Sequence, residues 1–580
     1  MKDHLYRWRN KEIRKQIAVI DEKESPTVIL KNALYLNVFL RKWMEAHIWI
    51  YEDRIVYVGK RLPEKLAGID IVDCSGKYVV PGYVEPHAHP FQLYNPYELA
   101  MYAGQTGTTT LMNDNLPWLY LLDNEKAFSL IDDFMQLPIS MFWWARFDSQ
   151  SAINEEKEIF NDEDIHLWLQ HEAVVQGGEL TAWPQVLQND DRILYWMQEA
   201  KRLRKPVEGH FPGASEKTLV KLKLLGASSD HEALSGEEVF NRLSMGYRVG
   251  LRHSSVRPDL GNLLQELQQL GLESYDYLTM TTDGSTPSFY KNGLINQCVQ
   301  IAIDEGVPPI EAYMMATYNA SEQFHLEERL GAIAPGRVAH INILDQIENA
   351  TPSSVLAKGK WLKKDGKLVN QSITIDWSSY GLGPLQLDWQ LTEKDLQFSM
   401  PVGLKMVNDV IMEPYPISID ANTEVISDTL DESFLMLADR EGEWRVNTVI
   451  NGFTRTLGGL ASSYSLTGDI VLIGKCKSDL LLAFNRMKEI GGGIVLVHEG
   501  EVIFELPLQV AGMMYDGKMP ALIAEDEKLK QLLIQHGYKY NDPPYSLLFL
   551  SSMHLPYARI TPLGIVDVKQ KEILFPAIMR

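Results

Sequence analysis

Short apolar runs alternate with amphipathic stretches through the middle of the chain. The apolar runs lie at residues 76–84, 106–112, 138–147, 172–178, 205–209, 224–230, 247–252 and 276–282. Between several of them, stretches such as residues 190–204 and 261–271 place apolar residues at helical spacing. Strand and helix alternating eight times within one block predict a (β/α)8 barrel of the TIM type over residues 81–335.

Two β-rich segments flank this block. Residues 28–80 and 336–375 contain short β-branched and aromatic runs punctuated by Gly, Asn and Asp, which predict strands and turns. We interpret them as one small antiparallel β domain of the sandwich type, into which the barrel is inserted. Residues 1–27 are polar and predict an N-terminal lead-in.

The last 205 residues, 376–580, predict a C-terminal domain of the α/β or α+β class. Strands are expected at residues 468–474, 491–508 and 545–550. Helices are expected at residues 478–491 and 526–537.

Composition narrows the class of protein. The chain has 580 residues, 45% of them hydrophobic, and a formal net charge of −22, which argues against a nucleic-acid or anionic-membrane binder. Its 3 cysteines lie far apart and predict no disulfide framework. Neither a signal peptide nor an apolar run long enough to cross a membrane is visible, so we expect a cytoplasmic protein.

The strongest local signal for chemistry is the segment PHAHP at residues 86–90. Alternate residues of a strand point to the same side, so His87 and His89 can bind one metal ion together. Neutral imidazole suits Zn, Fe, Mn or Ni, and the pair alone does not name the metal.

Four further residues of ligand type stand near the ends of other predicted strands. Glu179 follows the fourth strand, His210 the fifth, His231 the sixth and Asp283 the eighth. The carboxyl ends of barrel strands converge on one face, so all of these side chains should meet there. Such a set can hold two ions, with Glu179 as the bridging carboxylate and Asp283 as general base and acid.

Other candidates have two interpretations. Glu232 could carry protons, or its carboxylate could stabilise the start of a helix. Arg252 and His253, at the end of the seventh strand, could contact substrate or form a salt bridge with a neighbouring loop.

Several segments then resemble one known family, the bacterial adenine deaminases of the amidohydrolase superfamily. The barrel carries PGYVEPHAHP, GELTAWP, GHFPG, SSDHEALSGEE and an exit segment, MMATYNASEQFHLEERLGAIAPGRVAHINIL. The C-terminal domain carries GGLASSYS, GGGIVLVHEGEVIFELPLQVAGMM and DPPYSLLFLSSMHLPYARITPLGIVDV. The likeness therefore extends over most of the chain.

The resemblance implies hydrolytic deamination of adenine to hypoxanthine and ammonia, by attack of a metal-bound hydroxide on C6. It implies a binuclear divalent centre, with manganese or iron first and zinc as an alternative. The matching metal ligands are His87, His89, Glu179, His210, His231 and Asp283, with Glu232 as an active-site acid. A small-molecule partner and a homo-oligomer are also implied.

Three departures from the family pattern concern the surroundings of this site. Residues 113–115 read Asn-Asp-Asn where the family has a segment containing Pro-His-Glu, which makes Asn113 a candidate substrate-binding residue. Gly284 stands where the family has a second Asp. Residues 463–470, SYSLTGDI, replace a His-rich stretch.

Two alternative functions stay open at this point. The departures favour an amidohydrolase that acts on another aminated heterocycle, a cyclic amide or an N-acyl compound. A non-catalytic binding protein that kept the barrel would be expected to have lost a ligand.

Overall fold

The computed structural model describes residues 9–151, 159–370, 373–420 and 422–579. Its middle is a barrel of eight parallel strands in sequential order, and Ala88 and Asp283 form a parallel bridge between the first strand and the end of the last. The strands are β6 (Tyr83–Ala88), β7 (Thr108–Asn113), β8 (Ser140–Ala145), β9 (Val174–Leu180), β10 (Val207–Gly209), β11 (Ser229–Asp230), β12 (Arg248–Arg252) and β13 (Leu278–Thr281). Each overlaps one predicted apolar run, and the predicted fold class is confirmed.

The first predicted run combines two strands. Residues 78–81 form β5 (Tyr78–Pro81) of another sheet, and the chain enters the barrel only after Gly82. A Cβ at Gly82 would lie 2.0 Å from Thr109 Oγ1, so the close passage at this point requires glycine. Both strands are apolar and continuous in sequence, which conceals the change of sheet.

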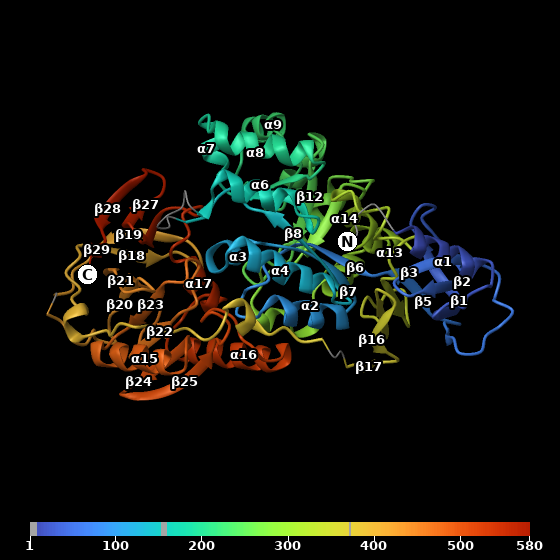
Figure 1. Cartoon of the computed structure of the whole chain (residues 1–580). Coiled ribbons are helices and arrows are strands. Elements are labelled where there is room, and N and C mark those ends of the chain that lie inside the picture. The colour runs from blue at the N-terminus through green and yellow to red at the C-terminus, as the bar shows by residue number, and fades with distance from the viewer. Residues whose placement is uncertain (1–8, 152–158, 371–372, 421, 580) are drawn as a thin grey trace.

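Helices surround the barrel (Figure 1). They are α2 (Pro96–Gln105), α3 (Leu116–Leu121), α4 (Asn124–Met135), α6 (Asp162–Gln170), α7 (Trp183–Leu187), α8 (Asp191–Arg202), α9 (Glu216–Leu225), α10 (Gly236–Ser244), α11 (Leu260–Gln269), α12 (Ile295–Asp304), α13 (Pro309–Met315) and α14 (Tyr318–Gln323). Helix α8 is typical: the Asp190 side chain accepts hydrogen bonds from the first turn, and Ile193, Trp196 and Met197 are buried on one face.

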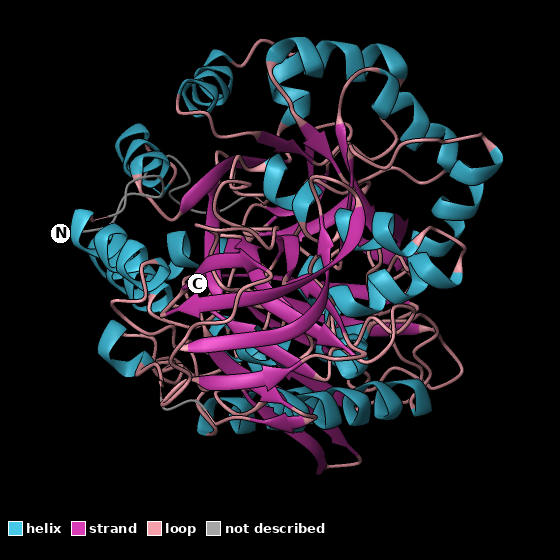
Figure 2. Cartoon of the chain, turned by 90° about the vertical axis from the view of Figure 1, so that its right-hand side faces the viewer, coloured by secondary structure: helices cyan, strands magenta, loops and turns pink. Residues whose placement is uncertain are grey.

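A nine-stranded sheet adjoins the barrel and joins segments from both sides of it in sequence. Figure 2 views the molecule from this side. Its strands are β1 (Val28–Asn37), β2 (Lys42–Tyr51), β3 (Arg54–Gly59), β4 (Asp70–Asp73), β5, β14 (Ile341–Leu344), β15 (Ser354–Ala357), β16 (Lys360–Lys364) and β17 (Lys367–Leu368). Most pairs are antiparallel, as predicted, but β1 pairs in parallel with β4 and β5. Helix α1 (Asn10–Ile20) precedes this sheet, and its Val19 is buried.

The C-terminal part lies on the opposite side of the barrel (Figure 1). Its nine-stranded sheet contains β18 (Val402–Met406), β19 (Met412–Pro416), β20 (Glu432–Ala438), β21 (Trp444–Asn451), β22 (Gly459–Ser462), β23 (Ile470–Gly474), β24 (Gly493–His498), β25 (Glu501–Pro507) and β29 (Ile578–Met579). A smaller sheet contains β26 (Ala558–Thr561), β27 (Gly564–Asp567) and β28 (Glu572–Pro576). The helices are α15 (Lys477–Glu489), α16 (Met519–Gln535) and α17 (Pro543–Phe549).

One predicted strand in this part is wrong. Residues 545–550 lie in and just after α17, whose first turn contains Pro543 and Pro544. Proline fits the first turn of a helix because its missing N–H has no partner there in any case. A short apolar run does not distinguish a buried strand from a buried helix. The two prolines before the run are the feature of the sequence that indicates the start of a helix.

A buried ionic cluster holds the C-terminal part against the barrel. Lys530 of α16 lies 3.3 Å from Asp526 and 3.4 Å from Asp542, and it donates a hydrogen bond to Thr286 at 2.7 Å. Thr286 in turn donates to Asp542 at 2.6 Å, close behind the end of β13. Asp526 and Asp542 are 0% and 1% exposed, so Lys530 supplies their neutralising charge.

Among the helices of the described residues, none has the length and apolar character needed to cross a bilayer.

We predict that Lys530→Met lowers the stability of the protein by about 3 kcal/mol, because it leaves two buried carboxylates without their cation. Thermal unfolding of the full chain measures the change. Lys528→Met, an exposed position on the same helix, is the matched control and should change stability by no more than about 0.5 kcal/mol. Equal unfolding temperatures for the two variants would contradict the role of the cluster.

Candidate metal centre

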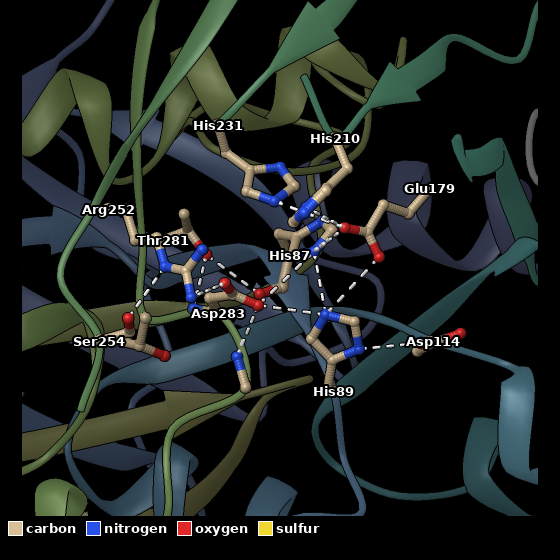
Figure 3. A network of polar contacts seen from close by, with 12 residues as sticks. His87, His89, Asp114, Glu179, His210, His231, Arg252, Ser254, Thr281 and Asp283 are labelled. Atoms are coloured by element: carbon tan, nitrogen blue, oxygen red, sulfur yellow. Dashed lines mark hydrogen bonds and ion pairs between the residues drawn. The ribbon is translucent and has the colours of Figure 1, made fainter. Parts of the chain in front are cut away.

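The six candidate ligands meet at the carboxyl ends of the barrel strands, where Figure 3 shows them pointing toward one another. They face a cavity of about 290 Å³ between the barrel and the C-terminal part. His89, Glu179, His210 and Asp283 line this cavity directly. The structure thus brings the side chains of six residues, from five separate strands, together at one end of the barrel.

His87 and His89 form the first donor group. Their Nε2 atoms lie 3.2 Å apart, and His89 Nε2 lies 3.1 Å from Asp283 Oδ1. His87 Nε2 lies 3.8 Å from the same oxygen. Strand alternation in β6 puts both rings on the inner side, so three donor atoms surround one point.

His210 and His231 form the second donor group. Glu179 Oε1 lies 2.9 Å from His210 Nδ1 and 3.6 Å from His231 Nε2. Glu179 Oε2 lies 3.9 Å from His89 Nε2, in the first group. Glu179 therefore lies between the groups, with its oxygens within 4.0 Å of imidazole nitrogens of both, as a bridging carboxylate would.

Partners that the sequence did not reveal orient three of the imidazoles. Glu208 of β10 accepts from Nδ1 of both His87, at 3.1 Å, and His231, at 3.2 Å. Asp114 lies 2.8 Å from Nδ1 of His89. These contacts turn the Nε2 atoms toward the centre, as carboxylates behind metal-bound histidines do.

A buried arginine contacts two of the carboxylates at the site. Together with Glu208 and Asp114 it forms the outer layer of residues behind the donor groups. Arg146 Nη2 donates to Asp114 at 2.6 Å and to Glu179 Oε2 at 2.7 Å. Signals for these residues existed in the sequence: Asp114 and Arg146 directly follow the second and third barrel strands, and Glu208 precedes His210 by two positions on the same strand face. Residues 113–115 stand where the family has Pro-His-Glu, and Asp114 of this segment orients the candidate ligand His89.

Asp283 and Glu232 share one arginine. Arg252 Nη2 lies 2.8 Å from Asp283 Oδ2, and its Nη1 donates to Glu232. Glu232 also accepts from Arg257 at 2.6 Å. Burial raises the pKa of Glu232, but His210, Arg252 and Arg257 outweigh it and bring the pKa to about 2, so this group is a carboxylate at neutral pH.

The donor set fits divalent cations. His231 Nε2 and His210 Nε2 are buried and have no hydrogen-bond partner within the part of the chain that the structure describes. Buried polar atoms of this kind ordinarily have a partner, and a cation would provide one. Imidazole nitrogens together with carboxylate oxygens are the ligands of Mn, Fe and Zn.

Charge supports the same conclusion. Five buried carboxylates face three guanidinium groups around the centre: Asp114, Glu179, Glu208, Glu232 and Asp283 against Arg146, Arg252 and Arg257. The excess negative charge attracts cations or protons. Burial lowers the pKa of His89, yet Asp114 and Asp283 outweigh it and raise the pKa to about 9.

Two of the candidate substrate-binding residues are not brought to the cavity. The Asn113 amide donates to the backbone carbonyls of Leu111 and Phe142, which ties it to the barrel wall. The His253 ring packs on Phe289, with 5.1 Å between ring centroids. Arg252, in contrast, lines the cavity.

The C-terminal part supplies the other half of the cavity wall. Its contributions include Leu466, Tyr545, Leu548, Phe549 and His554. The His554 ring stands edge-on to His210 at 5.2 Å, and burial, followed by the charge of His210, lowers the pKa of His554 to about 3. His554 therefore presents a neutral imidazole to the cavity.

One glutamine of the wall is held by a tyrosine of the C-terminal part. Gln92 Oε1 accepts from Tyr464 OH at 2.5 Å, and Tyr464 belongs to the segment 463–470. A Cβ at Gly284 would lie 2.9 Å from Gln92 Nε2 and 3.0 Å from His89 Cβ. Gly284 thus leaves room for Gln92 beside the metal-binding face, at the position where the family has a second Asp.

Comparisons with known proteins agree with this site. Residues 78–364 match the model of the amidohydrolase family, and residues 411–572 match that of the adenine deaminase C-terminal domain. The chain is 54% identical to a protein of Oceanobacillus iheyensis, over 99% of both chains. It is 51% identical to a protein of Halalkalibacterium halodurans, over 100% of both. Both carry the name "Putative adenine deaminase".

The chain belongs to the adenine deaminase family. Membership of this amidohydrolase family implies a divalent metal, and the donor groups described above can hold one. A solved β-aspartyl dipeptidase from Fervidobacterium islandicum AW-1 is 18% identical, with a TM-score of 0.46 over 60% of this chain and 100% of that one.

We predict that replacing His87 and His89 together by Ala abolishes metal binding and leaves the barrel folded, because neither side chain belongs to the apolar core. Elemental analysis after reconstitution with Mn²⁺ should give about two ions per chain for the unaltered protein. His253→Ala, which changes a barrel histidine outside the donor groups, is the control and should keep its metal. Full metal content in the double variant would show that the centre lies elsewhere.

Proposed function

We propose that this protein catalyses the hydrolytic deamination of adenine to hypoxanthine and ammonia. Its metal ligands would be His87, His89, Glu179, His210, His231 and Asp283, and its metal manganese or iron, with zinc as an alternative. The observation that supports this most strongly is the position of Glu179 between two donor groups, beside Asp283 and facing one cavity. The names of the relatives support adenine as the substrate.

Water hydrolyses the C6–N6 bond of the purine: a C6–O bond forms, the C6–N6 bond breaks, and the amino group takes up a proton and leaves as ammonia. Divalent cations held by these ligands would lower the pKa of a water molecule and stabilise negative charge on the attacked ring. The protein's own side chains must then move one proton from the water to the leaving nitrogen and hold the ring in place.

The contacts of Asp283 support a role in moving that proton. Its Oδ1 faces the imidazole donors, while Arg252 holds Oδ2 at 2.8 Å. The carboxylate is therefore fixed in orientation, with one oxygen toward the imidazole donors and the other toward Arg252. We assign to Oδ1 the removal of the water proton and its return to the leaving amino group.

Polar groups of the cavity wall suit the edges of an aminated heterocycle. Glu232 is ionised and can accept hydrogen bonds from N–H groups of the substrate. Gln92 and Arg252 can donate to ring nitrogens, while Tyr545 and Phe549 offer apolar faces to the ring.

We predict that metal-replete protein releases ammonia from adenine and forms hypoxanthine. Supplementation with manganese, iron and zinc in parallel would identify the active metal. Ammonia release and the change in purine absorbance measure turnover. If protein with its full complement of metal does not turn over adenine, the proposed substrate is wrong.

We predict that Asp283→Asn keeps much of the metal but loses roughly 10²- to 10⁴-fold in kcat, because an amide binds as a neutral ligand and accepts no proton. Steady-state kinetics and elemental analysis on the same preparation separate the two effects. Undiminished kcat would remove Asp283 from proton transfer.

A second candidate substrate is an aminated heterocycle that carries a further substituent. A hollow of about 100 Å³ shares Phe91, Leu466 and Leu548 with the main cavity and extends toward Arg440. Free adenine offers no group to occupy it. Higher kcat/KM for substituted purines or pyrimidines than for adenine in an ammonia-release panel would favour this candidate.

Two further expectations accompany the proposal. On family likeness we expect a homo-oligomer, and from the sequence a cytoplasmic location. Sedimentation of the purified protein and fractionation of cells would test them.

A further inference from the structure

Glu208 makes a hydrogen bond to one imidazole of each donor group, from the side away from Glu179. Its Oε2 lies 3.1 Å from His87 Nδ1, and its Oε1 lies 3.2 Å from His231 Nδ1. The two imidazoles are packed together, with ring centroids 4.1 Å apart. Glu208 is 3% exposed, so water does not compete for either oxygen.

The contacts determine which ring nitrogens carry protons. An ionised carboxylate only accepts hydrogen bonds, so with Glu208 ionised both Nδ1 atoms donate to it. A neutral imidazole protonated at Nδ1 has a free lone pair on Nε2. Both Nε2 atoms point toward Glu179, at 4.0 Å from His87 and 3.6 Å from His231.

The backbone explains how one side chain reaches both rings. Glu208 and His210 lie two positions apart in and just after β10, so both point inward, and β10 lies between β9 and β11 in the barrel. Glu208 sits beneath His210, between the strand that carries Glu179 and the strand followed by His231. His87 comes from across the barrel, where Trp144 stacks on its outer face at 4.6 Å.

We propose that Glu208 is a positioning residue that holds His87 and His231 in the metal-binding tautomer and couples the two halves of the centre. This inference rests on the proposed metal centre. Because a single carboxylate fixes one ligand of each half, ordering of either imidazole by a cation orders the other. The second ion then binds to a preorganised site.

Two variants test the bridge. In Glu208→Gln the amide can accept from only one Nδ1–H, and its NH₂ group forces the other imidazole into the tautomer with a protonated Nε2. Glu208→Asp keeps the charge but is one methylene shorter and cannot reach both rings. Both variants should lose roughly 10- to 100-fold in Mn²⁺ affinity. Asp148→Asn is the matched control, since this buried carboxylate bonds to Thr181 and Ala182 and should bind Mn²⁺ as the unaltered protein does.

Isothermal titration of metal-depleted full-length protein with Mn²⁺ measures affinity and stoichiometry. Circular dichroism of the same samples shows whether each variant is folded. We also expect the coupled binding of two ions to separate into two resolved steps in Glu208→Asp.

The outcomes are distinct. Full Mn²⁺ affinity in Glu208→Asp together with weak binding in Glu208→Gln would mean that only charge matters, and would overturn the positioning role. Full affinity in both would overturn any role of Glu208. If the unaltered protein binds no Mn²⁺, Fe²⁺ or Zn²⁺, the metal centre itself is wrong, whatever the variants do.

Discussion

Closure of the barrel is the constraint on which the site depends. The parallel bridge between Ala88 and Asp283 brings the first barrel strand against the end of the last, and so brings His89 to 3.1 Å from Asp283. Glu85 reinforces the same seam by accepting hydrogen bonds from Thr281 at 2.6 Å and Thr282 at 2.7 Å. An open sheet with the same strands would leave the first and last ligands a full sheet width apart.

Burying this much charge is possible because nearly every charged group has a partner. Arg146 ties Asp114 to Glu179, Arg252 ties Asp283 to Glu232, and Glu208 serves two imidazoles. A buried charge without a partner costs several kcal/mol, so the outer layer is as necessary to the fold as to the chemistry. Within the residues that the structure describes, the Nε2 atoms of His210 and His231 have no hydrogen-bond partner, and these are atoms that a metal would bind.

The C-terminal part supplies one wall of the cavity at the barrel rim. The segment 463–470, where a His-rich stretch is replaced, places Tyr464 on Gln92 and Leu466 in the cavity wall. Residues 551–554 approach the loop after β8, where Met553 N donates to Gln150 O at 2.9 Å. Gly284 and the segment 463–470 therefore lie beside Gln92 of the cavity wall, while residues 113–115 lie behind the wall, where Asp114 contacts Nδ1 of His89.

The sequence by itself determined the barrel and its donor types. Short apolar runs, helices of period 3.6 and a His-x-His at a strand end are local properties. The rule that strand ends converge then extended the predicted site to six residues. Only the tertiary structure decided what stands behind those donors. The contacts of Glu208 with His87 and His231, and of Arg146 with Asp114 and Glu179, join different strands, and no local pattern encodes them. The tertiary structure likewise tied Asn113 to the barrel wall and placed residues 545–549 in a helix, because hydrogen-bond partners and packing neighbours are set by the closed fold.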